Sequence, residues 1–96
     1  MTIRMGKHEF DDVVYDAAGD VLYMHKGKPL AAGETQASPE GHAVRLDKEG
    51  EIVGVTIVNA RWLAERDGEI TISKPERLTA SAGDLAAALG WLSRST

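Results

Sequence analysis

The sequence predicts an α+β fold, a mainly antiparallel β-sheet meander of about 5–6 strands with one C-terminal α-helix packed on it. Two observations predict it. Short segments rich in β-branched and aromatic residues alternate between apolar and polar side chains, and acidic turns that contain glycine separate several of them. Only at residues 81–92 does the spacing of apolar residues change to that of a helix.

The composition fits one globular domain over residues 1–96, because a chain of this length buries about 60–65% of its unfolded surface in a single core. Eleven Lys and Arg face fifteen Asp and Glu, which gives a net charge of −4, and the basic residues are scattered. Nucleic-acid binding is therefore not expected. No apolar run could span a membrane, and the chain has no cysteine, so we expect a cytoplasmic protein.

The first third of the chain predicts a hairpin. Residues 1–9 are mostly polar and are expected to be a flexible N-terminus, whereas residues 10–16 and 20–26 predict two antiparallel strands around a glycine turn. Residues 26–33 have the composition of a loop. The polar segment 34–41 contains Pro39 and leaves room for no more than a short edge strand.

The middle of the chain contains the clearest strands, at residues 42–47 and 52–59. Gly54 lies inside the second of them and predicts a bulge or the close approach of another group. Residues 60–66 fit either a helical turn or a strand. A strand is favoured, because Ile70 and Ile72 alternate with polar residues directly afterwards, up to Pro75.

The predicted C-terminal helix, residues 81–92, has a narrow apolar stripe formed by Leu85, Ala88, Leu89 and Leu92. Ser81 and Asp84 have the spacing of a capping box at its start. Gly90 either interrupts the helix or ends it. Because the stripe is small, the helix is expected to pack on the sheet.

Three segments share an acid at each end and a glycine just before the second acid: residues 16–20, 47–51 and 65–69. A glycine at this place supplies the positive φ that closes a hairpin, and the first acid can accept hydrogen bonds from the amides of the turn. Three hairpins are therefore predicted. Calcium binding is disfavoured, because none of the segments has the ligand spacing of an EF-hand loop.

No motif for catalysis, phosphate binding or metal binding is present, so no catalytic, cofactor or metal residues are predicted. His8, His25 and His42 lie far apart in sequence, although His25 and His42 fall in predicted strands and leave a joint site open. Trp62 and Trp91 have two interpretations. Completing the core beneath the helix is favoured over binding a partner.

Residues 15–24 and 39–60 resemble the bacterial family known as domain of unknown function 2283. The positions that carry the resemblance are Tyr15, Asp16, Asp20, Tyr23, Asp47, Gly50, Gly54, Asn59 and Ala60. Arg61 stands where the family has a serine, so no role of that serine is carried over, and the chain from Trp62 onward extends beyond the family's core. The resemblance implies a small antiparallel β domain without established catalysis and an antitoxin-like role beside small toxin-like genes.

Our leading hypothesis is a noncatalytic module that acts through protein–protein contacts, with another protein or as a homodimer, using an exposed strand edge or the region of Trp62. The alternative is a small-ligand or metal-binding protein, including an enzyme, that uses His25, His42 and nearby carboxylates. Nucleic-acid binding is the least favoured hypothesis.

Overall fold

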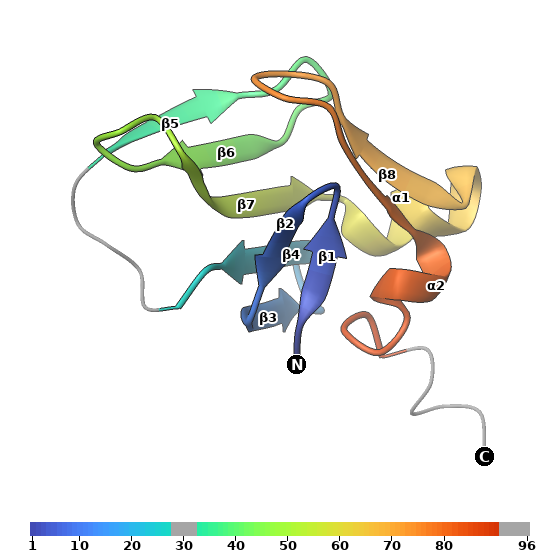
Figure 1. Ribbon diagram of the computed structural model, residues 1–96. Coiled ribbons are helices and arrows are strands. Elements are labelled where there is room, and N and C mark those ends of the chain that lie inside the picture. Colours follow the sequence, from blue (N-terminus) through green and yellow to red (C-terminus); the bar gives the residue numbers. More distant parts are fainter. Residues whose placement is uncertain (28–32, 91–96) are drawn as a thin grey trace.

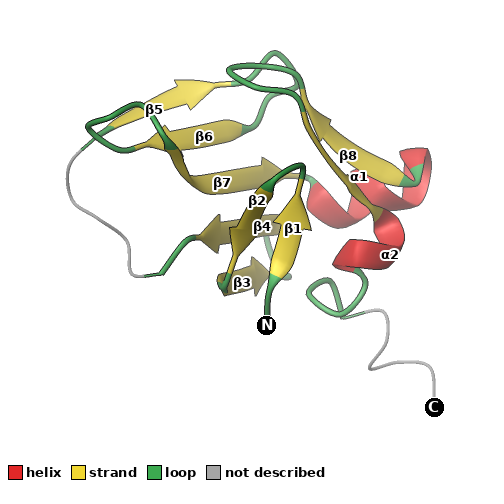
Figure 2. Ribbon diagram, viewed as in Figure 1, coloured by secondary structure: helices red, strands yellow, loops and turns green. Residues whose placement is uncertain are grey.

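The computed structural model describes residues 1–27 and 33–90, and within them the chain forms three antiparallel sheets and two helices (Figures 1 and 2). The α+β prediction is confirmed. The largest sheet has five strands in the order β3-β4-β7-β6-β5. Its strands are β3 (Asp12–Asp16), β4 (Val21–His25), β7 (Ile52–Val58), β6 (Ala43–Leu46) and β5 (Glu34–Ala37).

The order of this sheet departs from a simple meander, because β4 pairs with β7 instead of with the next strand in the sequence. The hairpin of β3 and β4 is thus joined to the meander of β5, β6 and β7. A short strand, β5, does form within residues 34–41, and it lies at an edge, as predicted for any strand there. Neither α1 (Ala60–Asp67) nor α2 (Ala82–Leu85), which are all the helices of the described residues, could cross a membrane.

The prediction that residues 1–9 form a flexible N-terminus is wrong. It forms most of a hairpin of β1 (Ile3–Met5) and β2 (His8–Phe10). Period-two alternation points Ile3, Met5 and Phe10 inward, where each is at most 2% exposed. The hairpin lies against β7 and covers one face of the large sheet (Figure 1). Arg4 and Glu9 occupy its other face, while His8 points inward with the apolar residues.

The prediction that favoured a strand at residues 60–66 is also wrong, because this segment is helix α1. Asn59 adopts a left-handed conformation, with φ of 60°, and turns the chain out of the sheet. Ala60 and Ala64 lie one helical turn apart and are both buried. The helix ends at Gly68, whose φ is 76° and whose amide donates to the carbonyl of Ala64.

Consequently the third acidic glycine segment is the end of a helix and not a hairpin turn. The other two segments do close hairpins, between β3 and β4 and between β6 and β7. In the second of these, Gly50 has a φ of 81°, and Asp47 Oδ1 accepts from the amides of Glu49 and Glu51 at 2.9 Å each. In the first, the residue with positive φ is Asp20, at 56°, and not the glycine.

The C-terminal helix is shorter than predicted. The capping box of Ser81 and Asp84 is confirmed, but α2 spans only Ala82–Leu85. Beyond it, the amides of Ala86 and Gly90 donate to the carbonyls three residues earlier, as in a 3₁₀ turn, and Gly90 has a φ of 82°. The predicted positions 91 and 92 lie outside the described residues. The helix packs on β1 and on β9 (Leu78–Ser81). Strand β9 was not predicted from the sequence, and it pairs with β8 (Glu69–Ile72).

The irregularity predicted at Gly54 is confirmed. Arg45 pairs with Gly54, but the next residue of β6, Leu46, pairs with Ile52, so the register shifts at this point. A side chain at Gly54 would also meet the ring of His25, because an ideal Cβ would lie 2.7 Å from its Cδ2 atom. The glycine therefore makes room for the histidine on the neighbouring strand.

Candidate functional site

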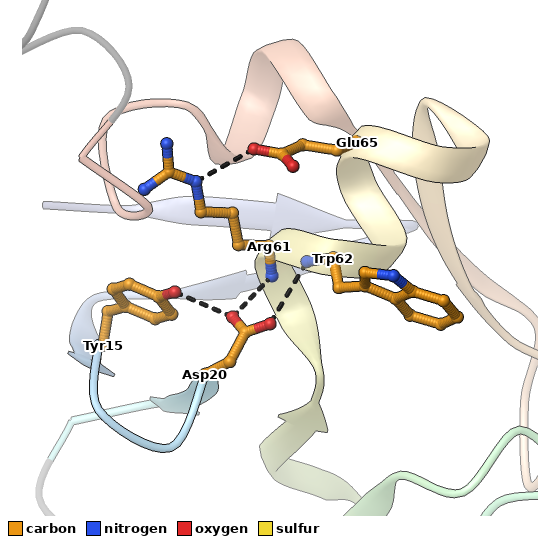
Figure 3. Close-up of polar contacts among 5 residues, drawn as sticks. All are labelled: Tyr15, Asp20, Arg61, Trp62 and Glu65. Atoms are coloured by element: carbon orange, nitrogen blue, oxygen red, sulfur yellow. Dashed lines mark hydrogen bonds and ion pairs between the residues drawn. The ribbon is translucent and has the colours of Figure 1, made fainter.

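The carboxylate of Asp20 links the hairpin of β3 and β4 to helix α1 (Figure 3). Its Oδ1 atom accepts from the hydroxyl of Tyr15 at 2.7 Å and from the amide of Arg61 at 2.8 Å, and its Oδ2 atom accepts from the amide of Trp62 at 3.2 Å. Asn59, at the N-cap position, makes no side-chain capping bond. Asp20 therefore caps this helix from a distant part of the sequence.

The electrostatics of this junction favour a charged carboxylate next to a neutral phenol. Burial alone would raise the pKa of Asp20, but the hydrogen bonds from Arg61, Tyr15 and Trp62 outweigh it and hold the pKa below its ordinary value. Burial and the bond to Asp20 raise the pKa of Tyr15 to about 12. A phenol that is this hard to ionise is a poor general base at neutral pH. The junction thus serves the fold.

His8 has a similar structural role. Its Nε2 atom lies 3.0 Å from Glu76 Oε2, and its Nδ1 atom lies 2.7 Å from Lys26 Nζ. Its side chain is almost completely buried, between the N-terminal hairpin, the end of β4 and the loop before β9. These two contacts tie three distant segments together and leave both ring nitrogens occupied.

The structure does not bring His25 and His42 together. His25 lies over Gly54 on the exposed face of the large sheet, whereas His42 is 3% exposed and precedes β6 on the covered side. They line two different hollows. No group of three histidine or acidic side chains that could hold a metal ion occurs among residues 1–27 and 33–90.

The hollow beside His42 has a volume of about 430 Å³. It lies between the loop before β6, helix α1 and strand β8, and its lining residues are Glu40, His42, Leu63, Arg66, Asp67, Glu69, Ile70 and Thr71. Burial lowers the pKa of His42, although the negative charge of Glu40 opposes this effect. The hydrogen bond from Ser73 lowers the pKa of Glu40 to about 2. At neutral pH the hollow therefore contains a neutral histidine near a charged carboxylate.

Trp62 does not complete the core, so the favoured interpretation of this residue is wrong. Its side chain is 54% exposed, and the guanidinium of Arg66 lies 4.4 Å from the centre of its ring. Its use as a partner-binding residue stays a prediction. Trp91 lies outside the described residues.

We call the exposed side of the five-stranded sheet the outer face. Alternating residues of three neighbouring strands form it: Asp12, Val14, Asp16, Val21, Tyr23, His25, Thr56 and Val58. Val14 is 58% exposed, and Tyr23 and Val58 are each 40% exposed, so nothing in the described part of the chain buries these side chains. Large apolar side chains exposed together are a common feature of interaction surfaces.

The outer face ends at β3, which pairs with β4 on one side and has no strand on its other side within the described residues. Along this edge Asp12, Val14 and Asp16 point to the outer face, while Val13 and Tyr15 pack against the core. The strand was predicted from the sequence, but no role was expected for this acid–apolar–acid pattern. The alternation within residues 12–16 was the available signal.

Comparison with known proteins finds no family model, no curated protein and no solved structure that matches this chain. The resemblance to domain of unknown function 2283 stays a prediction.

Proposed function

We propose that the chain is a noncatalytic protein-binding module that accepts an extended segment of another protein beside the edge strand β3. The observation that carries this proposal is the pattern of Asp12, Val14 and Asp16 along that edge, next to the exposed Tyr23. An edge strand offers unpaired backbone groups, and adding a strand from a partner is a common way to satisfy them.

Of the two edges of the five-stranded sheet, β3 suits a partner better. It has five residues, and its exposed Val14 continues into the apolar part of the outer face. At the opposite edge, β5 has four residues and no large apolar side chain. A strand added beside β3 therefore brings a partner's apolar side chain next to Val14, which itself lies beside Tyr23 of β4, while a strand added beside β5 gains little apolar contact.

The charges on β3 oppose pairing with a second copy. In an antiparallel pair of two β3 strands centred on Val14, Asp12 of each copy lies opposite Asp16 of the other. Like charges directly opposite each other are unfavourable by about 0.2–1 kcal/mol for each pair, and both pairs here are acidic. The net charge of −4 on each copy adds long-range repulsion. This edge therefore favours a different protein over homodimerisation.

The same charges specify the chemistry of the partner. A segment with an apolar residue opposite Val14 and Lys or Arg two positions to either side places both cations opposite Asp12 and Asp16. Each such pair contributes about 0.2–1 kcal/mol, and the cations also increase the rate of encounter with an acidic domain. An antitoxin-like role is the narrower form of this proposal.

Titration with short peptides tests the proposal. A capped peptide of the sequence Thr-Lys-Thr-Val-Thr-Lys-Thr is expected to bind at least about tenfold more tightly than the same peptide with Glu in place of Lys. Changing Asp12→Asn and Asp16→Asn together should remove most of this preference, because asparagine keeps the hydrogen bonds of the turn but not the charge.

Glu49→Gln is the matched control, since Glu49 is an exposed acid in the turn between β6 and β7. It should leave the preference for lysine unchanged. Equal binding of the two peptides to the unaltered protein would contradict the proposal, and so would an equal loss of preference in the control. Growth rescue on co-expression with a basic toxic protein encoded beside this chain tests the antitoxin-like form.

A further inference from the structure

The hollow beside His25 lies on the same side of the five-stranded sheet as the outer face, and the proposed function does not use it. The described residues that line it all belong to β4, β5, β6 and β7. Side chains on paired strands are held more precisely than side chains on loops. The volume of about 250 Å³ is just below the range of about 300–1,000 Å³ of pockets for drug-sized molecules, so the hollow suits a ligand the size of a single ring.

The register of the strands explains why the sheet is hollowed here. Gly54 pairs with His25 on one side and with Arg45 on the other, and Arg45 in turn pairs with Thr35. Residues directly opposite each other on neighbouring strands point to the same face, so these four positions form one row across the sheet. Because Gly54 has no side chain, the row has a gap between the guanidinium and the ring of His25, which lies over the glycine.

A second row closes the other side of the hollow. Thr56 pairs with Tyr23 and with Ala43, and all three line the hollow. Tyr23 is two residues before His25 on β4, so the two rings stand on the same face about 7 Å apart along the strand. A planar ring between them lies within the distance of about 4.5–7 Å at which aromatic rings attract each other.

The charge in the hollow is positive, although the chain as a whole has a net charge of −4. Arg45 lines the hollow, and none of the described residues that line it is acidic. Asp12 pairs with His25 from β3, on the side away from Arg45. A guanidinium presents its N–H groups as a planar fork that matches the two oxygens of a carboxylate. The hydroxyls of Thr35 and Thr56 add two more donors to the same hollow.

We propose that this hollow binds a small aromatic carboxylate. The carboxylate pairs with the guanidinium of Arg45 and accepts from the hydroxyls of Thr35 and Thr56, while the ring lies between Tyr23 and His25. Two independent features select this class: the fork of the arginine selects a planar anion, and the two neighbouring rings select an aromatic group. Among the described residues β3 contributes none to the hollow, so the site does not depend on the function proposed for that edge.

Four probes separate the contributions in the unaltered protein. Nuclear magnetic resonance titrations compare benzoate with benzamide, which keeps the ring without the charge, and with acetate and inorganic phosphate, which keep a charge without the ring. We expect benzoate to bind with a Kd on the order of 1 mM, at least about tenfold more tightly than each of the others. The backbone amides of Ala43, Gly54 and Thr56 should shift during the titration.

Two variants and one control assign the contacts. Arg45→Gln removes the charged fork, so it should weaken benzoate by about tenfold and leave benzamide unchanged. Gly54→Ala adds a methyl group to the floor of the hollow, so it should weaken both ligands. Arg4→Gln is the matched control, because Arg4 is an exposed arginine of β1 that does not line this hollow. It should alter neither.

Equal affinity of the unaltered protein for benzoate and benzamide overturns the proposal, and so does phosphate that binds as tightly as benzoate. The absence of shifts at about 10 mM benzoate overturns it as well. It also fails if Arg45→Gln, folded by circular dichroism, binds benzoate as tightly as the unaltered protein does. If that variant does not fold, the comparison of the four probes still decides the question.

Discussion

Replacing Asp20 by alanine is expected to destabilise the protein by about 3 kcal/mol, because three separate effects meet at this residue. Helix α1 loses the acceptor for its first amides, which costs about 1 kcal/mol. The half-buried hydroxyl of Tyr15 loses its partner, which costs about 1 kcal/mol more. Alanine in the left-handed conformation, at a φ of 56°, adds about 1 kcal/mol of backbone strain.

Urea denaturation followed by circular dichroism measures this loss directly, and the corresponding fall in Tm is about 12–24 °C for a domain of this size. Two variants separate the effects. Asp20→Gly removes the bonds but relieves the strain, so it should cost about 2 kcal/mol, whereas Asp20→Asn keeps an acceptor and tolerates the conformation, so it should cost about 1 kcal/mol.

Asp16→Ala is the matched control. Asp16 lies in the same turn, and among the described residues its carboxylate accepts only from the amides of Ala18 and Gly19, at 3.1 and 3.4 Å. Its replacement should cost less than about 1 kcal/mol. If Asp20→Ala costs no more than Asp16→Ala, the claim that Asp20 joins the hairpin to the helix is refuted.

Three other predictions concern Tyr15, Gly50 and Gly54. Because the pKa of Tyr15 is raised to about 12 in the folded protein, its stabilising contribution is complete below its ordinary pKa of about 10 and is lost as the pH rises through about 12; Tyr15→Phe should remove this alkaline loss in denaturation curves. Gly50→Val should destabilise by about 1 kcal/mol or more through its φ of 81° alone, since no atom lies within 4 Å of the added Cβ, and an unchanged midpoint of unfolding would contradict this. Gly54→Ala should destabilise by about 1 kcal/mol because of its contact with His25, and His25→Ala should reduce that cost in a double-mutant cycle; strict additivity would show that the ring is not what Gly54 accommodates.

Local patterns were sufficient to predict most strands of the five-stranded sheet, although not their order. The alternation within residues 42–47 and 52–59 gave β6 and β7, and the turn chemistry of Asp47 and Gly50 gave the hairpin between them. The capping box at Ser81 was also readable, because its partners lie three residues apart. These features depend on neighbours in the sequence, which is why period and turn residues reveal them.

Helix α1 could not be predicted in this way, because its decisive contact comes from Asp20, some forty residues earlier. A segment of eight residues with only two fully buried alanines has a weak helical pattern, and the glycine that ends it looks the same as a hairpin glycine. The N-terminal hairpin was missed for a related reason. Its strands have only three residues each, too short for alternation to be distinguished from a polar tail.

The candidate binding regions were only partly visible in the sequence. Histidine, tryptophan and carboxylates were noted as residue types, but tertiary structure decides which ones meet. It leaves His25 on the outer face, brings His42 next to helix α1 and strand β8, and leaves Trp62 exposed. The edge at β3 follows from the pairing of β4 with β7, which no local pattern specifies.

Hydrogen exchange of the backbone amides in β3 tests the account most directly, because it reports which strand edge a partner occupies. On addition of the lysine-containing peptide, amides of Asp12–Asp16 that face away from β4 should become protected, while those of Glu34–Ala37 at the opposite edge should not change. Protection at β5 instead, or no protection at either edge while the peptide is bound, would contradict it.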